Sequence, residues 1–89
     1  MIEKLTARYD NDSDVLYVAL GRPVPATSDS DDDGLVVRYS LADGHACGVT
    51  IIGFESEWGS RLQRLSKLIG SYLHVQSREV ESTLQTVLH

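Results

Sequence analysis

The chain has 89 residues, of which 42% are hydrophobic and 24% are charged, and its thirteen acids outnumber its eight bases to give a formal net charge of −5. This length and hydrophobic content fit one small folded domain and argue against disorder. We therefore expect one domain over residues 1–89, with a β-meander in residues 1–55 and a helical tail in residues 56–89.

Cysteine content and hydropathy favour a cytoplasmic protein. The one cysteine, Cys47, cannot form an intrachain disulfide, which fits a reducing compartment. Residues 1–5 lack the charged-then-apolar layout of a signal peptide, and no apolar run approaches the roughly 20 residues that span a bilayer. We expect a cytoplasmic location and no membrane partner.

The distribution of charge argues against a nucleic-acid partner. Residues 1–55 hold ten acids and four bases, whereas residues 56–89 hold three acids and four bases. Nucleic-acid binding depends on neutralising phosphates, which an acidic sheet cannot do. Arg61, Arg64 and Lys67 line one side of an expected helix, but such a pattern is usual for a solvated helix face.

Apolar patterning predicts an α+β fold with a four-stranded antiparallel meander. Residues 2–8 alternate weakly, and residues 15–20 are apolar on both faces, as expected for a central strand. Residues 35–41 and 46–54 complete the predicted sheet. The intervening residues 21–33 contain both prolines and an aspartate cluster, so we expect a connecting arm and a polar loop there.

The hairpin between the last two predicted strands has two alternative registers. A two-residue turn ending at Gly44 would pair Leu35 with Ile52, whereas a three-residue loop over 42–44 would pair Leu35 with Ile51. Register follows the buried face, and the second alternative places apolar on apolar. We therefore predict the three-residue loop, with Gly44 in the left-handed region.

The tail predicts one or two amphipathic helices, and we favour two. The first begins at Ser56 or Ser60, and the second covers residues 77–88. Gly70 weakens the first helix, so we expect a close contact there. The apolar stripe of the first helix comprises Leu62, Leu65, Leu68, Ile69, Tyr72 and Leu73.

A second helix needs a surface of its own, because a four-stranded sheet buries one face under one helix. That surface is either the far face of the sheet or the same helix in another subunit. Since small cores are marginal alone, we expect a homodimer, with an unidentified protein partner as the alternative. The expected interface residues lie on the apolar helix stripes and are Leu65, Ile69, Tyr72, Val80, Leu84 and Val87.

The chain resembles a family of short bacterial domains of unknown function over about residues 5–55. Members of this family begin Tyr-Asp-x-x-x-Asp-x-Leu-Tyr-(Ile/Val), and the matching residues here are Tyr9, Asp10, Asp14, Leu16, Tyr17 and Val18. Later landmarks follow in the same order, namely Asp33, Gly34, Tyr39, Asp43, Gly44, Gly48, Val49 and Ile51.

The resemblance implies an antiparallel meander followed by helix, in a family without an assigned activity. The chain departs from the family in a turn before Gly44 that is one residue longer and in Thr50, where the family usually has an acid. The helical tail is also long.

An acidic segment resembles the first half of a calcium-binding loop. Asp29, Asp31 and Asp33 occupy positions one, three and five, and Gly34 occupies position six. Position twelve is Ser40, which cannot supply the bidentate carboxylate that closes such a site. The alternatives are a weak Ca²⁺ or Mg²⁺ site at these aspartates and a solvated acidic turn.

Four other polar residues have structural interpretations. We expect Asp10 or Asp14 to accept hydrogen bonds from backbone N–H groups in their loop. His45 and Cys47 lie two residues apart, but a structural zinc ion needs four ligands, so we interpret them as a turn histidine beside a thiol.

No catalytic residue or cofactor is assigned from these patterns. The leading hypothesis is a non-enzymatic interaction module that self-associates, or binds a protein, through its helices. The alternative is a protein that weakly binds a divalent cation or small ligand at the acidic loop, residues 29–33.

Overall fold

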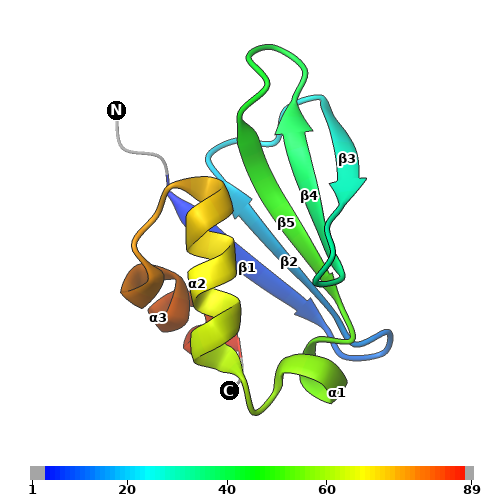
Figure 1. The fold of residues 1–89 in the computed structure, drawn as a ribbon, viewed down its shortest axis with the longest axis vertical. Coiled ribbons are helices and arrows are strands. Elements are labelled where there is room, and N and C mark those ends of the chain that lie inside the picture. The colour runs from blue at the N-terminus through cyan, green and yellow to red at the C-terminus, as the bar shows by residue number, and fades with distance from the viewer. Residues whose placement is uncertain (1–3, 88–89) are drawn as a thin grey trace.

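A computed structural model describes residues 4–87, in which five strands form one antiparallel sheet and three helices follow (Figure 1). The strands are β1 (Leu5–Asp10), β2 (Val15–Leu20), β3 (Ala26–Ser30), β4 (Leu35–Ser40) and β5 (Ala46–Ile52). The helices are α1 (Phe54–Trp58), α2 (Leu62–Leu73) and α3 (Ser77–Val87).

The α+β class is confirmed, but the predicted four-stranded meander is wrong. Residues 26–30, expected in a loop, form β3, which pairs with β4 from Ala26 opposite Ser40 to Ser30 opposite Val36. The sheet order is β1-β2-β5-β4-β3, so β5 lies between β2 and β4. β3 lacks large apolar side chains, and its strand conformation depends on backbone pairing with β4.

The second strand has the predicted central position, between β1 and β5. Leu16 and Val18 face the helices and are buried, whereas Val15, Tyr17 and Ala19 face the other way. In the described part of the chain the first strand begins at Leu5; the predicted start at residue 2 lies outside the described residues.

The predicted register of the last hairpin is confirmed, because Leu35 lies opposite Ile51. Gly44 has a φ of 76°, in the left-handed region, as expected. The register shifts after Arg38, and Tyr39 lies opposite Ala46. The extra residue is Cys47 on β5, and the turn covers residues 41–44 between Ser40 and His45, so the predicted loop over 42–44 is one residue too short.

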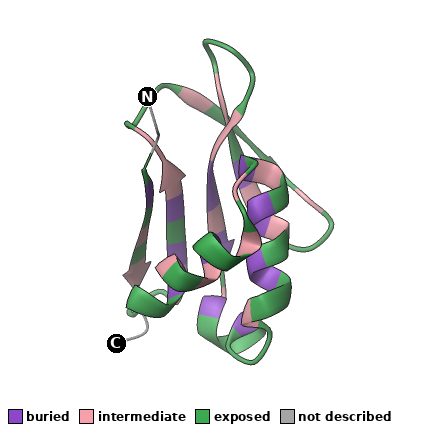
Figure 2. Cartoon of the chain, turned by 90° about the vertical axis from the view of Figure 1, so that its left-hand side faces the viewer, coloured by how far each residue is buried: buried purple, intermediate pink, exposed green. Residues whose placement is uncertain are grey.

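Both long helices cover the same face of the sheet (Figures 1 and 2). α2 packs on β5, α3 packs on β1, and the two helices pack against each other. The expectation that the second helix needs a separate surface is therefore wrong, because β1 and β5, which carry the two helices, lie far enough apart in the sheet for both helices to fit on one face. No helix within residues 4–87 is long and apolar enough to cross a membrane.

The two helices are separate, as predicted. His74 ends α2 in the left-handed conformation with a φ of 58°, and its N–H bonds to the carbonyl of Gly70. The N–H of Val75 also bonds to that carbonyl, at 3.0 Å. A Cβ atom at Gly70 would clash with the carbonyl oxygen of Val75, so the predicted close contact is confirmed.

The core lies between the inner face of the sheet and the helices, and all three helices contribute to it. Its best-buried members come from three strands and all three helices: Leu16, Leu35, Val49, Ile51, Phe54, Leu65, Ile69, Val80 and Leu84. The sheet face opposite the helices has no covering layer in residues 4–87 (Figure 2).

Candidate functional site

Asp14 joins the β1–β2 loop to the first helix. Its carboxylate accepts hydrogen bonds from the backbone N–H of Glu55 at 2.8 Å, from the N–H of Ser56 at 3.1 Å and from the Tyr9 hydroxyl at 2.7 Å. Gly53 precedes the helix and has no side chain to cap it, so Asp14 satisfies the free N–H groups from a distant loop.

These hydrogen bonds shift the ionisation of both side chains. The N–H of Glu55 and the Tyr9 hydroxyl stabilise the carboxylate and lower the pKa of Asp14 to about 2. The hydrogen bond to Asp14 raises the pKa of Tyr9 well above its ordinary value. The ring of Tyr9 also packs edge to face with Phe54, with centroids 5.4 Å apart. The pair therefore has a structural role.

The hydrogen bonds predicted for this loop are confirmed for Asp10, which accepts from the N–H of Asp12 at 3.1 Å. Asp14 also binds backbone N–H groups, but they belong to α1 and not to its own loop. Sequence alone does not reveal this role, because the two segments are about forty residues apart.

A second aspartate–tyrosine pair joins the β3–β4 loop to α2. One carboxylate oxygen of Asp31 accepts from the N–H of Asp33 at 2.9 Å and from that of Leu35 at 2.8 Å. The other accepts from the Tyr72 hydroxyl at 2.6 Å, which raises the pKa of Tyr72 to about 12. Asp31 therefore orders its loop and anchors it to the helix layer.

The three aspartates of the candidate cation site do not converge. Asp29 is exposed on β3, opposite Val37, and the carboxylate of Asp33 lies 3.6 Å from the Arg64 guanidinium. Asp31 is committed to the bonds described above. No three or more His, Cys, Asp or Glu side chains within residues 4–87 are arranged to hold a metal ion.

The predicted interface residues lie mainly inside the chain's own core. Leu65, Ile69, Val80 and Leu84 are each 0% exposed. Tyr72 and Val87 are half-buried and pack against the same core. The apolar stripes of α2 and α3 thus cover the sheet of their own chain.

The outer face of the sheet, defined here as the face opposite the helices, carries the largest exposed apolar side chains of the regular strands. Tyr17 is 38% exposed and Ile52 is 61% exposed. The Arg8 guanidinium lies 4.7 Å from the centroid of the Tyr17 ring. Thr50 of β5 lies on the same face, opposite Tyr17 on β2 and Val36 on β4.

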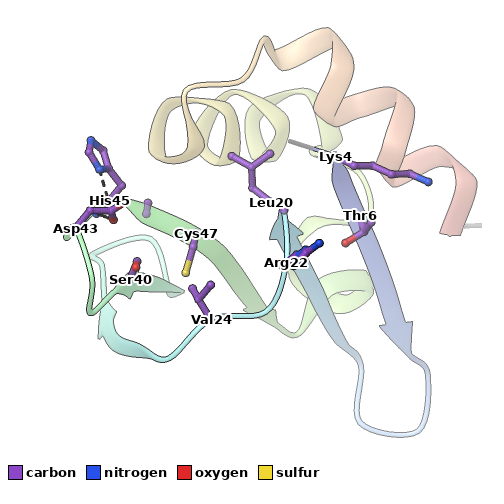
Figure 3. Close-up of a pocket in the computed structure, with 11 residues that line it drawn as sticks. Lys4, Thr6, Leu20, Arg22, Val24, Ser40, Asp43, His45 and Cys47 are labelled. Atoms are coloured by element: carbon purple, nitrogen blue, oxygen red, sulfur yellow. Dashed lines mark hydrogen bonds and ion pairs between the residues drawn. The ribbon is translucent and has the colours of Figure 1, made fainter. Parts of the chain in front are cut away.

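A cavity of about 580 Å³ lies at one end of the sheet (Figure 3). It is bordered by the arm of residues 21–25, which crosses from β2 to β3, and by the loop between β4 and β5. Leu20, Val24 and Cys47 contribute apolar surface to its middle. Cys47 is half-buried and its thiol is free.

Polar groups occupy the two ends of this cavity (Figure 3). Lys4, Thr6 and Arg22 lie at one end. Asp43 and His45 lie at the other, with the His45 Nδ1 atom 3.5 Å from the Asp43 carboxylate. The backbone N–H of His45 also donates to that carboxylate and lowers the pKa of Asp43.

Sequence patterns do not reveal this cavity, because its walls come from three segments, residues 4–6, 20–24 and 40–47, that meet only when the sheet forms. The sequence relates only two of its residues by spacing, His45 and Cys47, which are predicted to be a turn histidine beside a thiol. The arm of residues 21–25 was expected to be a connection, and no pattern within it indicates a wall.

The fold defines an α+β domain in which a five-stranded antiparallel sheet carries helices on one face. Residues 7–54 match the sequence profile of the family described as a protein of unknown function (DUF2283), and the chain belongs to that family. The match covers the sheet except for the first two residues of β1, reaches the first residue of α1, and does not include α2 or α3. Searches of curated proteins and of solved structures each gave no match.

Proposed function

We propose that this protein is a non-enzymatic interaction module that forms a homodimer through the outer face of its sheet. The observation that supports the proposal is that both long helices cover one face and leave Tyr17 and Ile52 exposed on the other. Exposed apolar surface on a small domain is a frequent feature of protein interfaces, where aromatic residues are enriched.

The charges on the outer face favour a second copy as the partner. By strand alternation, the outward positions of β1, β2, β4 and β5 include only three charged residues, Arg8, Asp10 and Arg38. Two chains that each carry a net charge of −5 repel through most of their surface, and least through this face. Arg8 and Asp10 give it opposite charges that can pair reciprocally across a two-fold axis.

The size of the outer face suits a weak dimer. Five strands spaced by about 4.8 Å, with a mean length of six residues at about 3.3 Å per residue, give a footprint of roughly 480 Å². This footprint is a flat area that leaves out the additional surface of protruding side chains. It is more than half of the roughly 800 Å² that each partner buries in a standard interface.

Analytical ultracentrifugation over a concentration series tests the proposal. We expect the unmodified protein to dimerise with rising concentration, and the double variant Tyr17→Glu/Ile52→Lys to remain monomeric. The matched control is Gln63→Glu/Ser71→Lys, which makes the same changes of charge on exposed positions of α2 and should dimerise normally.

Two results would contradict the proposal. One is an unmodified protein that stays monomeric throughout the series. The other is a Tyr17→Glu/Ile52→Lys variant that dimerises as strongly as the control. Circular dichroism melting curves of all three proteins establish that each remains folded, which is expected because the substituted positions lie outside the core.

A further inference from the structure

We propose that the cavity beside the arm of residues 21–25 binds a small monocarboxylate with an apolar body, the carboxylate at the end lined by Arg22, Thr6 and Lys4 and the body against Leu20 and Val24 (Figure 3). The volume of about 580 Å³ lies within the range of roughly 300 to 1,000 Å³ that is usual for small-molecule sites. The cavity borders the proposed interface at Thr6, an outward position of β1, but Tyr17 and Ile52 do not line it.

The first argument concerns the two cations at one end of the cavity. Neither Lys4 nor Arg22 forms an ion pair with any acid of residues 4–87. In a chain with thirteen acids and a net charge of −5, two such cations at one cavity make a local positive field. Arg22 has the planar guanidinium that matches a carboxylate, and Thr6 adds a hydroxyl beside it.

The second argument concerns the middle of the cavity. Leu20, Val24, Ala46 and Cys47 supply an apolar surface between its polar ends. An inorganic anion would leave this surface in contact with water, whereas an aliphatic or aromatic body covers it. Ligand sites commonly combine such apolar walls with a few polar groups that fix orientation.

The third argument comes from the opposite end and selects a monoanion. The Asp43 carboxylate, which accepts from the backbone N–H of His45 at 3.0 Å, places a negative charge at that end of the cavity. A second carboxylate on the ligand would approach Asp43 and be repelled. A neutral end can instead lie beside the His45 and Ser40 side chains.

Titrations followed by amide chemical shifts, with hexanoate, hexanamide and adipate as probes, test this inference. We expect hexanoate to shift the amide signals of residues 21–24 and 45–47 and to bind about tenfold more tightly than neutral hexanamide. Adipate, which has the same carbon chain and a second carboxylate, should bind more weakly than hexanoate. Asp43→Asn should remove that difference while its amide oxygen keeps the turn bond.

Variants assign the binding to the cavity. The double variant Lys4→Gln/Arg22→Gln should weaken hexanoate binding about tenfold or more. Arg78→Gln, at an exposed position of α3, removes a cation elsewhere and should leave binding unchanged. The monomeric Tyr17→Glu/Ile52→Lys variant should bind hexanoate as the unmodified protein does, so this test is independent of dimerisation.

The inference is overturned if hexanoate causes no shifts around the cavity, or if hexanamide binds as tightly as hexanoate. It is also overturned if Lys4→Gln/Arg22→Gln retains full affinity while its amide spectrum shows an intact fold.

Discussion

The hydroxyl of Tyr9 donates to the carboxylate of Asp14 across a distance of 2.7 Å, and the same carboxylate accepts from the N–H groups of Glu55 and Ser56. The backbone carbonyl of Asp14 also accepts from the N–H of Gly53, at 2.8 Å. One residue of the β1–β2 loop thus determines where the chain leaves β5 and begins α1.

Replacing Asp14 by Asn should lower the melting temperature at neutral pH, because the amide group repels at least one of the donors that the carboxylate satisfies. The effect depends on pH with a definite sign. The pKa of Asp14 is lowered in the folded protein to about 2, from an unfolded value of 3.8. Its stabilisation is therefore complete above the unfolded pKa and is lost as pH falls through the folded one.

Melting curves of the unmodified protein and Asp14→Asn between pH 7 and pH 2 measure this effect. The difference in melting temperature should be largest at neutral pH and shrink as the pH falls from about 4 to about 2. Asp12→Asn, at an exposed position of the same loop, is the control and should show little difference at any pH. A difference between unmodified protein and Asp14→Asn that does not change with pH would contradict the assignment.

The sequence predicts the importance of this loop better than its mechanism. Tyr9 and Asp14 stand out by composition and by family resemblance, and the inward face of β1 follows from alternation. Their contact with Glu55 is not predictable from spacing, since it depends on β5 lying beside β2. Local patterns reveal turns and faces, but not which distant segment a turn meets.

Tyr72→Phe should lower the free energy of unfolding by about 1 kcal/mol, because it removes the hydroxyl that binds Asp31 at 2.6 Å in a half-exposed setting. Chemical denaturation measures the change, provided that the m-value is the same for the variant and the unmodified protein. Tyr39→Phe is the control, since the Tyr39 hydroxyl has no hydrogen-bond partner within residues 4–87. Equal losses in the two variants would show that the Asp31 bond contributes nothing.

Ser66→Ala should stabilise the protein. Ser66 on α2 is 1% exposed, and its hydroxyl oxygen has no hydrogen-bond partner among the described residues, 4–87. A buried polar group without a partner costs about 1 to 3 kcal/mol, and alanine also has the higher helix propensity. We expect the free energy of unfolding to rise by about 1 kcal/mol more than for Ser71→Ala, at an exposed position of the same helix. An equal or smaller gain at Ser66 would mean that its hydroxyl is satisfied.

The sequence-based fold differs from the structure in two places. Residues 26–30 present no apolar alternation, and only the neighbouring edge of β4 makes them a strand. The two long helices lie side by side over β5 and β1, an arrangement that depends on the strand order and not on any local pattern. By contrast, the pairing of Leu35 with Ile51 was predictable, because burial of one face selects it.

Leu84→Ala distinguishes a core role of α3 from a role in dimerisation. Leu84 is 0% exposed in the chain's own core, so its truncation should lower the free energy of unfolding by about 2 to 5 kcal/mol. Measured in the monomeric Tyr17→Glu/Ile52→Lys background, the loss should not depend on protein concentration, because no subunit contact is involved. Gln85→Ala, at the adjacent exposed position, should change stability by less than about 0.5 kcal/mol. A loss below about 1 kcal/mol for Leu84→Ala would mean that α3 does not pack on its own sheet. The apolar stripe of α3 would then be exposed and would be a candidate interface.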